Sequence, residues 1–228
     1  MGARAVVGGV VVLGVLAVGA VVADGVARGQ AEDQAATIIQ QQLGLAAPPD
    51  VEIAGFPFLP QLMARSLDDV RATAPDVTFD GVQATDVAVT ATGVGLDAPY
   101  PAGTVRLEAT VPTASVQQVV GERTQMDVTV DGGMLRATGT MLGMELTAGL
   151  TPRVQDGRLL VDVQDVTVGP ATLKLEQLPG DVAERLVGIE VPLEGLPQGV
   201  QLQDAVVVPD GVRFTAGGTD LQLEQVAP

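Results

Sequence analysis

The sequence predicts an α+β domain built mainly from antiparallel strands, whose sheet either folds into a sandwich or curls strongly around a helix. Beyond residue 76, segment after segment alternates apolar and polar residues, as "TVRLEATV" does at 104–111, so each strand presents one apolar face. Strands of this kind are typical of antiparallel sheets. One substantial helical pattern, Arg28 to Leu43, and two or three short ones are available to cover that face. The sheet must therefore fold into a sandwich or curl around the long helix.

The first element is an apolar segment. "AVVGGVVVLGVLAVGAVVA" runs from Ala5 to Ala23 without a charge, and as a helix it would reach about 28 Å, close to the hydrocarbon thickness of a bilayer. Arg4 upstream favours a cytoplasmic N-terminus, while a cleaved signal peptide is the alternative. We therefore predict that residues 1–27 are a transmembrane signal-anchor or signal peptide. Residues 28–228 then form a single exported domain, at the outer face of the cytoplasmic membrane or in the periplasmic space.

The helix expected next is amphipathic and has a clear end. Gly44 is a suitable residue just past its C-terminus, and Pro48-Pro49 prevents its continuation. Its polar residues, including Glu32, are expected to point away from the apolar face. The apolar face comprises Ala31, Ala35, Ile38, Ile39 and Leu43.

Turns and short helices punctuate the strands that follow. Asp131-Gly132-Gly133, Asp156-Gly157 and Asp210-Gly211 have the composition of tight hairpin turns. The apolar phase slips between Val163 and Val166, which predicts a β-bulge. Short helices are expected where Ser115 to Gln118 resembles a capping box, ahead of Val116, Val119 and Val120, and where Asp181 and Glu184 precede Leu186.

Composition excludes several classes of function. The 228-residue chain has a net charge of −16, so it repels phosphate backbones and nucleic acid is not an expected partner. It contains neither cysteine nor histidine, which removes the usual zinc ligands, thiolate nucleophile and imidazole base. We expect no catalytic residue, metal or cofactor. The small residues at inward positions fit either an apolar channel or a tightly packed core.

One short stretch concentrates the bulky apolar residues. "AGFPFLPQLM" at 54–63 holds two of the four phenylalanines and two prolines. Pro57 and Pro60 lack backbone donors, which keeps the segment out of a regular sheet. Pro60 also suits the first turn of a short helix carrying Leu62, Met63 and Leu67.

The same region resembles a known family. "DVEIAGFPFLPQLMARSLDDVRATAPDVTF" at 50–79, followed by "DGVQATDVAVTATGVGLD" at 80–97, is similar to the LmeA-type phospholipid-binding family of bacterial, chiefly actinobacterial, cell envelopes. The resemblance implies an exported protein that binds phospholipid, including phosphatidylinositol-type lipids, with a role in elongating lipomannan-type glycolipids. It also implies a tubular lipid-binding (TULIP-like) fold, in which a curved sheet wraps a long helix around an apolar cavity.

With this resemblance, candidate lipid-binding residues can be named. An apolar lip of the cavity is expected from Ile53, Phe56, Phe58, Leu59, Leu62, Met63 and Leu67. Cations that could orient a phosphate headgroup are Arg65, Arg71, Arg123 and Lys174.

The sequence thus favours a non-enzymatic phospholipid-binding protein of the cell envelope that holds acyl chains in an apolar cavity, with lipid transfer and support of envelope glycolipid biogenesis as extensions of that role. The alternative is a dry β-rich domain that scaffolds envelope enzymes and binds no lipid. A hydrolase using paired carboxylates, such as Asp68-Asp69 or Asp162 with Asp165, is the least favoured, because paired acids on strand exteriors are usually solvated. The sequence names no protein partner.

Overall fold

The structure is a computed structural model of residues 1–228. It describes residues 2–79, 81–124, 126–141, 144–177, 186–192 and 199–222. Within these ranges, side-chain surroundings are described except at residues 2–20, 79, 122–124, 141 and 176. The predicted helix at Asp181 and Glu184 lies outside the described residues, as does the side chain of Arg123.

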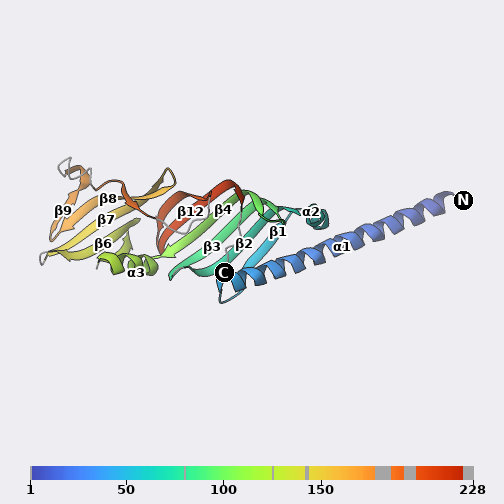
Figure 1. Cartoon of the computed structure of the whole chain (residues 1–228), viewed down its shortest axis with the longest axis horizontal. Coiled ribbons are helices and arrows are strands. Elements are labelled where there is room, and N and C mark those ends of the chain that lie inside the picture. The colour runs from blue at the N-terminus through green and yellow to red at the C-terminus, as the bar shows by residue number, and fades with distance from the viewer. Residues whose placement is uncertain are drawn as a thin grey trace. The chain divides into compact units, whose positions relative to one another are not determined.

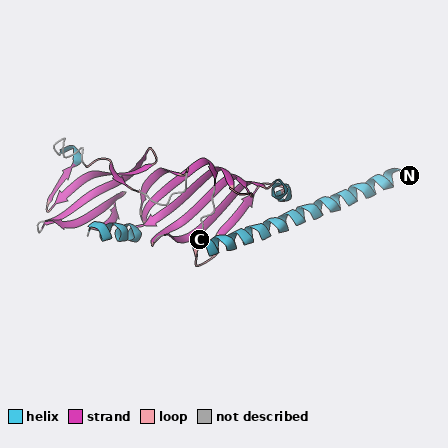
Figure 2. Cartoon of the chain, viewed as in Figure 1, coloured by secondary structure: helices cyan, strands magenta, loops and turns pink. Residues whose placement is uncertain are grey.

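Strands make up most of the described chain beyond the first helix (Figures 1 and 2). The helices are α1 (Gly2–Leu43), α2 (Phe58–Ala64) and α3 (Thr113–Thr124), with a 3-10 turn at Leu175–Gln177. The first strands are β1 (Asp50–Ala54), β2 (Ser66–Phe79), β3 (Val82–Gly95), β4 (Pro101–Pro112), β5 (Asp127–Asp131) and β6 (Met134–Met141). The later ones are β7 (Met144–Gln155), β8 (Arg158–Val168), β9 (Ala171–Lys174), β10 (Ile189–Val191), β11 (Gln201–Val208) and β12 (Gly211–Gln222).

The α+β class is confirmed, but the described strands are divided between two open sheets instead of one. The first sheet has the order β1-β2-β3-β4-β12-β11, and the second has the order β10-β8-β7-β6-β5, with β9 paired to β8. The pairings registered for the second sheet and for the β11–β12 hairpin are antiparallel. The wrapping of one sheet around a helix and the tubular cavity stay predictions.

Contacts divide the chain into two compact units. The first unit comprises residues 1–72, 90–103 and 222–228, and the second comprises residues 73–89 and 104–221. The first unit contains α1, β1 and α2, and its core is the buried cluster of Ile53, Phe58 and Leu67. Packed against this cluster are Ala27, Ala31, Val70, Val94 and Leu96.

Helix α1 includes the predicted helix and ends where expected, since Gly44 has a left-handed φ of 62°. The predicted apolar face is only partly right. Ala31 packs on the core, whereas Ile38 and Leu43 are exposed. The helix meets its own unit through its upstream turns instead of its last ones.

The second unit has two small cores beside the second sheet. One joins β8 to β11 and β12 through Leu159, Leu202, Ala205 and Ala216. In the other, α3 packs Val116 and Val120 against Val128, Leu135 and Val212. The predicted helix is therefore confirmed, but it begins at Thr113, so Ser115 lies inside it and is not its cap. Val119 is exposed and does not belong to the packing face.

The predicted turns agree with the structure at two of three places. Gly132 and Gly133 connect β5 to β6, and Asp156-Gly157 connects β7 to β8, all four with positive φ. At the third, Pro209-Asp210 is the turn, since Gly211 already pairs with Val208 in the hairpin. Gly211 is required for a different reason: a Cβ there would collide with the backbone of β4 at Val111.

Among the residues whose side chains are described, no helix is long and apolar enough to cross a membrane. Most of the Ala5–Ala23 segment lies outside those residues, so the anchor or signal peptide stays a prediction.

Candidate functional site

The family-like stretch at 53–67 is held against α1 by a stripe of three charged side chains. Asp24, Arg28 and Glu32 follow one another at intervals of four residues, so they lie along one side of the helix. Asp24 accepts hydrogen bonds from the backbone N–H groups of Phe58 (2.9 Å) and Leu59 (2.7 Å) at the start of α2. Below we call these three residues the α1 stripe.

The other two members of the α1 stripe also contact backbone. Arg28 Nη2 donates to the carbonyl of Gly55 at 2.7 Å, and Glu32 Oε1 accepts from the N–H of Ile53 at 2.8 Å. Glu32 was predicted to lie away from the apolar face of the helix, but it contacts the backbone of the buried Ile53. The pattern of apolar residues gave no sign of these contacts, because each one binds backbone that is distant in sequence.

Asp24 is a buried carboxylate, with 3% of the residue exposed. The Phe58 amide, followed by the Leu59 amide, lowers the pKa of Asp24 below its ordinary value, because both hydrogen bonds favour the charged form. Burial acts in the opposite direction, and the Arg28 guanidinium at 3.6 Å adds to the lowering. Asp24 is therefore ionised at neutral pH and fixes α2 to α1.

Gln61 closes the loop between β1 and α2. Its side-chain Oε1 accepts from the N–H of Asp68 at 2.9 Å, and its Nε2 donates to the carbonyls of Pro57 (3.4 Å) and Ala54 (3.5 Å). Gly55 has a φ of 94°, and a Cβ there would collide with the Gln61 amide. The Gly and Gln of the family-like motif are therefore both needed to build this loop.

The structure separates the predicted lip into two groups. Ile53, Phe58 and Leu67 are buried in the core of the first unit, and Phe58 is only 1% exposed. Leu67 lies on β2, not on the short helix where it was expected. The other group projects outward from α2 and the loop before it, with Phe56 68% and Met63 85% exposed. This exposed group, which we call the α2 patch, comprises Phe56, Leu59, Leu62 and Met63.

The predicted headgroup cations with described side chains are divided between the two units. Arg65 ends α2 with a left-handed backbone and pairs with Asp97 at 2.7 Å. Arg71 is exposed on β2, in the same unit. Lys174 is exposed on β9, which belongs to the second unit. A role in headgroup binding stays a prediction for each of them.

The second sheet carries an apolar face. Cross-strand partners share a face, and the register aligns Leu135 with Leu150, Ala137 with Ala148, and Ala148 with Val166. The predicted bulge is confirmed at residue 164, where the pairing passes from Asp165 directly to Val163. This bulge keeps Val163 and Val166 on the same side of the sheet.

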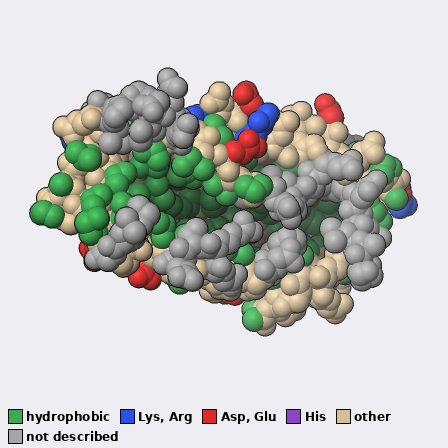
Figure 3. All heavy atoms as spheres, turned by 60° about the vertical axis from the view of Figure 1, so that its left-hand side comes forward, with side chains coloured by type: hydrophobic (Ala, Val, Ile, Leu, Met, Phe, Trp, Pro, Cys, Tyr) green, Lys and Arg blue, Asp and Glu red, His purple; other side chains and the backbone are tan. Residues whose placement is uncertain are grey.

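Described elements cover only part of this apolar face. Helix α3 covers it at β5, and β11 covers it near Leu159. Leu146, Ala148, Val166 and Val168 are half-buried, and the rim residues Met144, Leu173 and Ile189 are exposed. Figure 3, which turns the left-hand side of Figure 1 forward, shows hydrophobic side chains gathered in a hollow.

The uncovered area has a useful size. Four neighbouring strands, β6 to β9, span about 14 Å, and the five residues from 146 to 150 add about 13 Å along the strand. At about 25 cal/mol per Å², covering such an area is worth about 5 kcal/mol. Burying this area against apolar groups is therefore favourable.

The opposite face of the second sheet is polar. Arg136 Nη1 bonds Asp165 Oδ1 at 2.5 Å across Gly149, where a Cβ would lie 2.7 Å from the guanidinium. Arg153 pairs with Asp162 at 2.6 Å. Asp162 and Asp165, one of the two carboxylate pairs considered for a hydrolase, are thus neutralised by arginines in partly buried ion pairs. Threonines on the paired strands hydrogen-bond side by side, as Thr138 does with Thr147 and Thr167 with Thr172, at 2.9 Å each.

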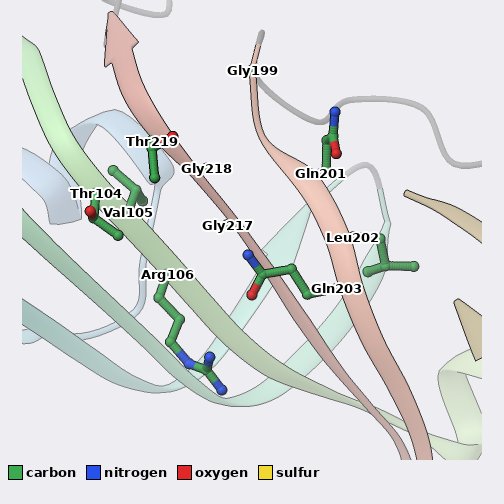
Figure 4. A pocket seen from close by; sticks show the side chains of 10 residues that line it. All are labelled: Thr104, Val105, Arg106, Gly199, Gln201, Leu202, Gln203, Gly217, Gly218 and Thr219. Carbon is green, nitrogen blue, oxygen red and sulfur yellow. The ribbon is translucent and has the colours of Figure 1, made fainter. Parts of the chain in front are cut away.

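A separate groove of about 450 Å³ lies over β4, β11 and β12 (Figure 4). Gln203 reaches from β11 over Gly217, while Leu202 points in another direction. Arg106 also lines the groove and pairs with Glu108 at 2.8 Å. The amide, hydroxyl and guanidinium groups here suit a polar group rather than an acyl chain.

Sequence reasoning predicted the apolar sheet faces but missed the α1 stripe, and it did not show which part of the apolar face other elements cover. The stripe had a readable signal, since its three charges recur every four residues. The apolar face also had a signal, since apolar and polar residues alternate along β5 to β8. Which part of that face the described elements leave uncovered depends on where α3 and β11 pack.

The model of the LmeA-like phospholipid-binding family matches residues 22–217 of the 228-residue chain. Comparisons with curated proteins and with solved structures gave no match. The family match includes the α1 stripe, the loop with Gly55 and Gln61, and the whole second sheet. The chain therefore belongs to the LmeA-like phospholipid-binding family.

Proposed function

We propose that this protein is a non-enzymatic carrier of phospholipid that acts outside the cytoplasmic membrane and holds acyl chains on the apolar face of the second sheet. The observation that carries the proposal is the part of that face, around Leu146, Ala148, Val166 and Val168, that the described elements leave uncovered. Membership of a phospholipid-binding family supports the same ligand.

The energetics fit a reversible carrier. A sixteen-carbon chain gains on the order of 12 kcal/mol when it leaves water, at about 0.8 kcal/mol per CH₂. Most of that gain already exists in the bilayer from which the lipid comes, so the net preference for the protein is small. Such a balance favours transfer between membranes over permanent storage, and it would suit a supporting role in envelope glycolipid biogenesis.

The remaining parts of the proposal rest on the sequence. The charge-free segment Ala5–Ala23 would export the domain, either as an anchor or as a cleaved signal. The tubular fold would enclose the acyl chains more fully than an open sheet does. An apolar sheet face is the kind of wall that such a cavity needs.

The test is lipid loading of the full chain and of variants on the two faces of β9. Leu173 and Thr172 are adjacent and exposed, but Leu173 pairs with Val166 on the apolar face and Thr172 with Thr167 on the polar face. Delipidated protein is incubated with phosphatidylglycerol vesicles, re-isolated, and its bound lipid is measured by mass spectrometry. We expect uptake by the wild type and by Thr172→Asp, and a loss of at least about tenfold for Leu173→Asp combined with Ala148→Asp.

Circular dichroism checks that each variant is folded, and Leu173→Asp alone gives a rim variant without a charge in the half-buried position. Wild-type protein that takes up no phospholipid would refute the proposal and favour the dry scaffold. Equal loss of uptake in Leu173→Asp and Thr172→Asp would show that the apolar face is not the site.

A further inference from the structure

The α2 patch is an exposed apolar surface on a rigid support. Phe56 and Met63 project outward, while Phe58 between them is anchored in the core. A contiguous exposed apolar surface marks an interaction site. Its position is fixed by the α1 stripe and by Gln61, so the exposed side chains do not result from a loose loop.

Charge selects the kind of partner. The chain carries a net charge of −16, yet residues 53–67 contain no acidic side chain, and Arg65 is the only charged residue among them. An anionic lipid surface would be repelled by most of this protein. The α2 patch is a part that can approach such a surface without repulsion.

Helix α1 adds further exposed apolar side chains beside the α2 patch. Val21 precedes Asp24 by three residues and therefore lies near the side of α1 that holds α2, and both Val21 and Val22 are exposed. Upstream, the sequence from Ala5 to Ala20 contains no charge. The patch thus lies beside the part of α1 at which the charge-free N-terminal segment ends.

We infer that the α2 patch inserts into the surface of a lipid bilayer and seats the first unit on the membrane. The inference rests on the proposed function to the extent that a lipid carrier must contact the bilayer that supplies its cargo. Phe56 and Met63 enter deepest, and Leu59 and Leu62 follow. The Asp24 carboxylate keeps this arrangement in place from within the protein.

The absence of tryptophan from the chain provides a direct test. Phe56→Trp and Met63→Trp each place a single fluorophore in the patch, and Ile38→Trp places one on an exposed position of α1. Ile38 lies about 21 Å beyond Asp24 along α1. The full-length variants are reconstituted into vesicles of phosphatidylcholine and phosphatidylglycerol with and without brominated acyl chains. We expect a blue shift and quenching by bromine for the two patch positions and neither for Ile38→Trp.

A second substitution tests insertion as a unit. Phe56→Asp added to Met63→Trp removes the blue shift, whereas Phe56→Leu keeps it, because only the charge opposes entry into hydrocarbon. Unquenched emission at both patch positions, equal to that of Ile38→Trp, would overturn the inference and leave the patch to a protein partner. Lipid loading is measured separately, so quenching without bound lipid would refute only the proposed function, and bound lipid without quenching would refute only the docking.

Discussion

Phe58 and Phe56 form a natural pair for testing how the first unit is stabilised. They lie two residues apart, and their exposures are 1% and 68%. Phe58→Ala empties the centre of the cluster formed with Ile53 and Leu67, which costs about 3–5 kcal/mol for a buried phenylalanine. Phe56→Ala removes a side chain that packs little, so we expect a change within about 0.5 kcal/mol.

The assay is thermal unfolding of the full chain in one detergent, followed by far-UV circular dichroism. For a chain of this size 1 kcal/mol corresponds to about 2–4 °C. We therefore expect Phe58→Ala to lower the melting temperature by about 6–20 °C, and Phe56→Ala by less than about 2 °C. Hydrogen exchange at the amides of Ile53 and Asp68 reports on the same unit, and it should accelerate only in Phe58→Ala.

The reasoning fails if both variants melt within about 2 °C of each other. That result would mean that Phe58 is not the packing anchor of the loop. The division of the predicted lip into a buried and an exposed group would then have no energetic basis.

Three further predictions concern the rest of the chain. Because the folded-state pKa of Asp24 is lowered, its stabilising effect is complete above the ordinary carboxyl pKa of 3.8 and is lost as pH falls through the lowered value. The difference in melting temperature between wild type and Asp24→Ala should therefore be constant from about pH 7 to pH 5 and should disappear below pH 3.8. A difference that does not change with pH would contradict this. Gly211→Ala should lower the free energy of unfolding by more than about 1 kcal/mol, since its Cβ meets the β4 backbone. Gly25→Ala, which has open space around it, should stabilise α1 by about 0.5–1 kcal/mol. Chemical unfolding compares the two variants, and equal effects would rule out the close approach at Gly211. In a double-mutant cycle, Arg136→Ala and Asp165→Ala should show a coupling energy of about 0.5–3 kcal/mol, and strictly additive effects would show that the bridge across Gly149 does not contribute.

Local features of the fold could be predicted from the sequence. The turns at Gly132 and Asp156 follow from residues that tolerate positive φ, and the bulge at residue 164 follows from a slip in apolar phase. Each of these signals is contained in fewer than about ten residues, on the scale of a single strand or hairpin. The end of α1 at Gly44 is of the same kind.

Long-range pairing could not be predicted in this way. Nothing in the periodicity of β4 indicates that it lies beside β12, about a hundred residues later, or that the strands separate into two sheets. Burial within 53–67 was equally hidden, because a proline-rich loop has no period that would tell Phe58 from Phe56. The family resemblance identified this stretch correctly but gave no indication of which side chains face inward.

The spacing of the α1 stripe has a consequence for the orientation of the N-terminal helix. A residue inserted before Asp24 leaves all three docking contacts in place, whereas one inserted between Asp24 and Arg28 turns the two apart by about 100° around the axis. The contacts of the α1 stripe therefore fix the rotation of α1 about its own axis, but they set no limit on the length of the helix before Asp24. Each residue added to or removed from α1 upstream of Asp24 would change the reach of the helix by about 1.5 Å and would turn the residues before it by about 100° relative to the domain.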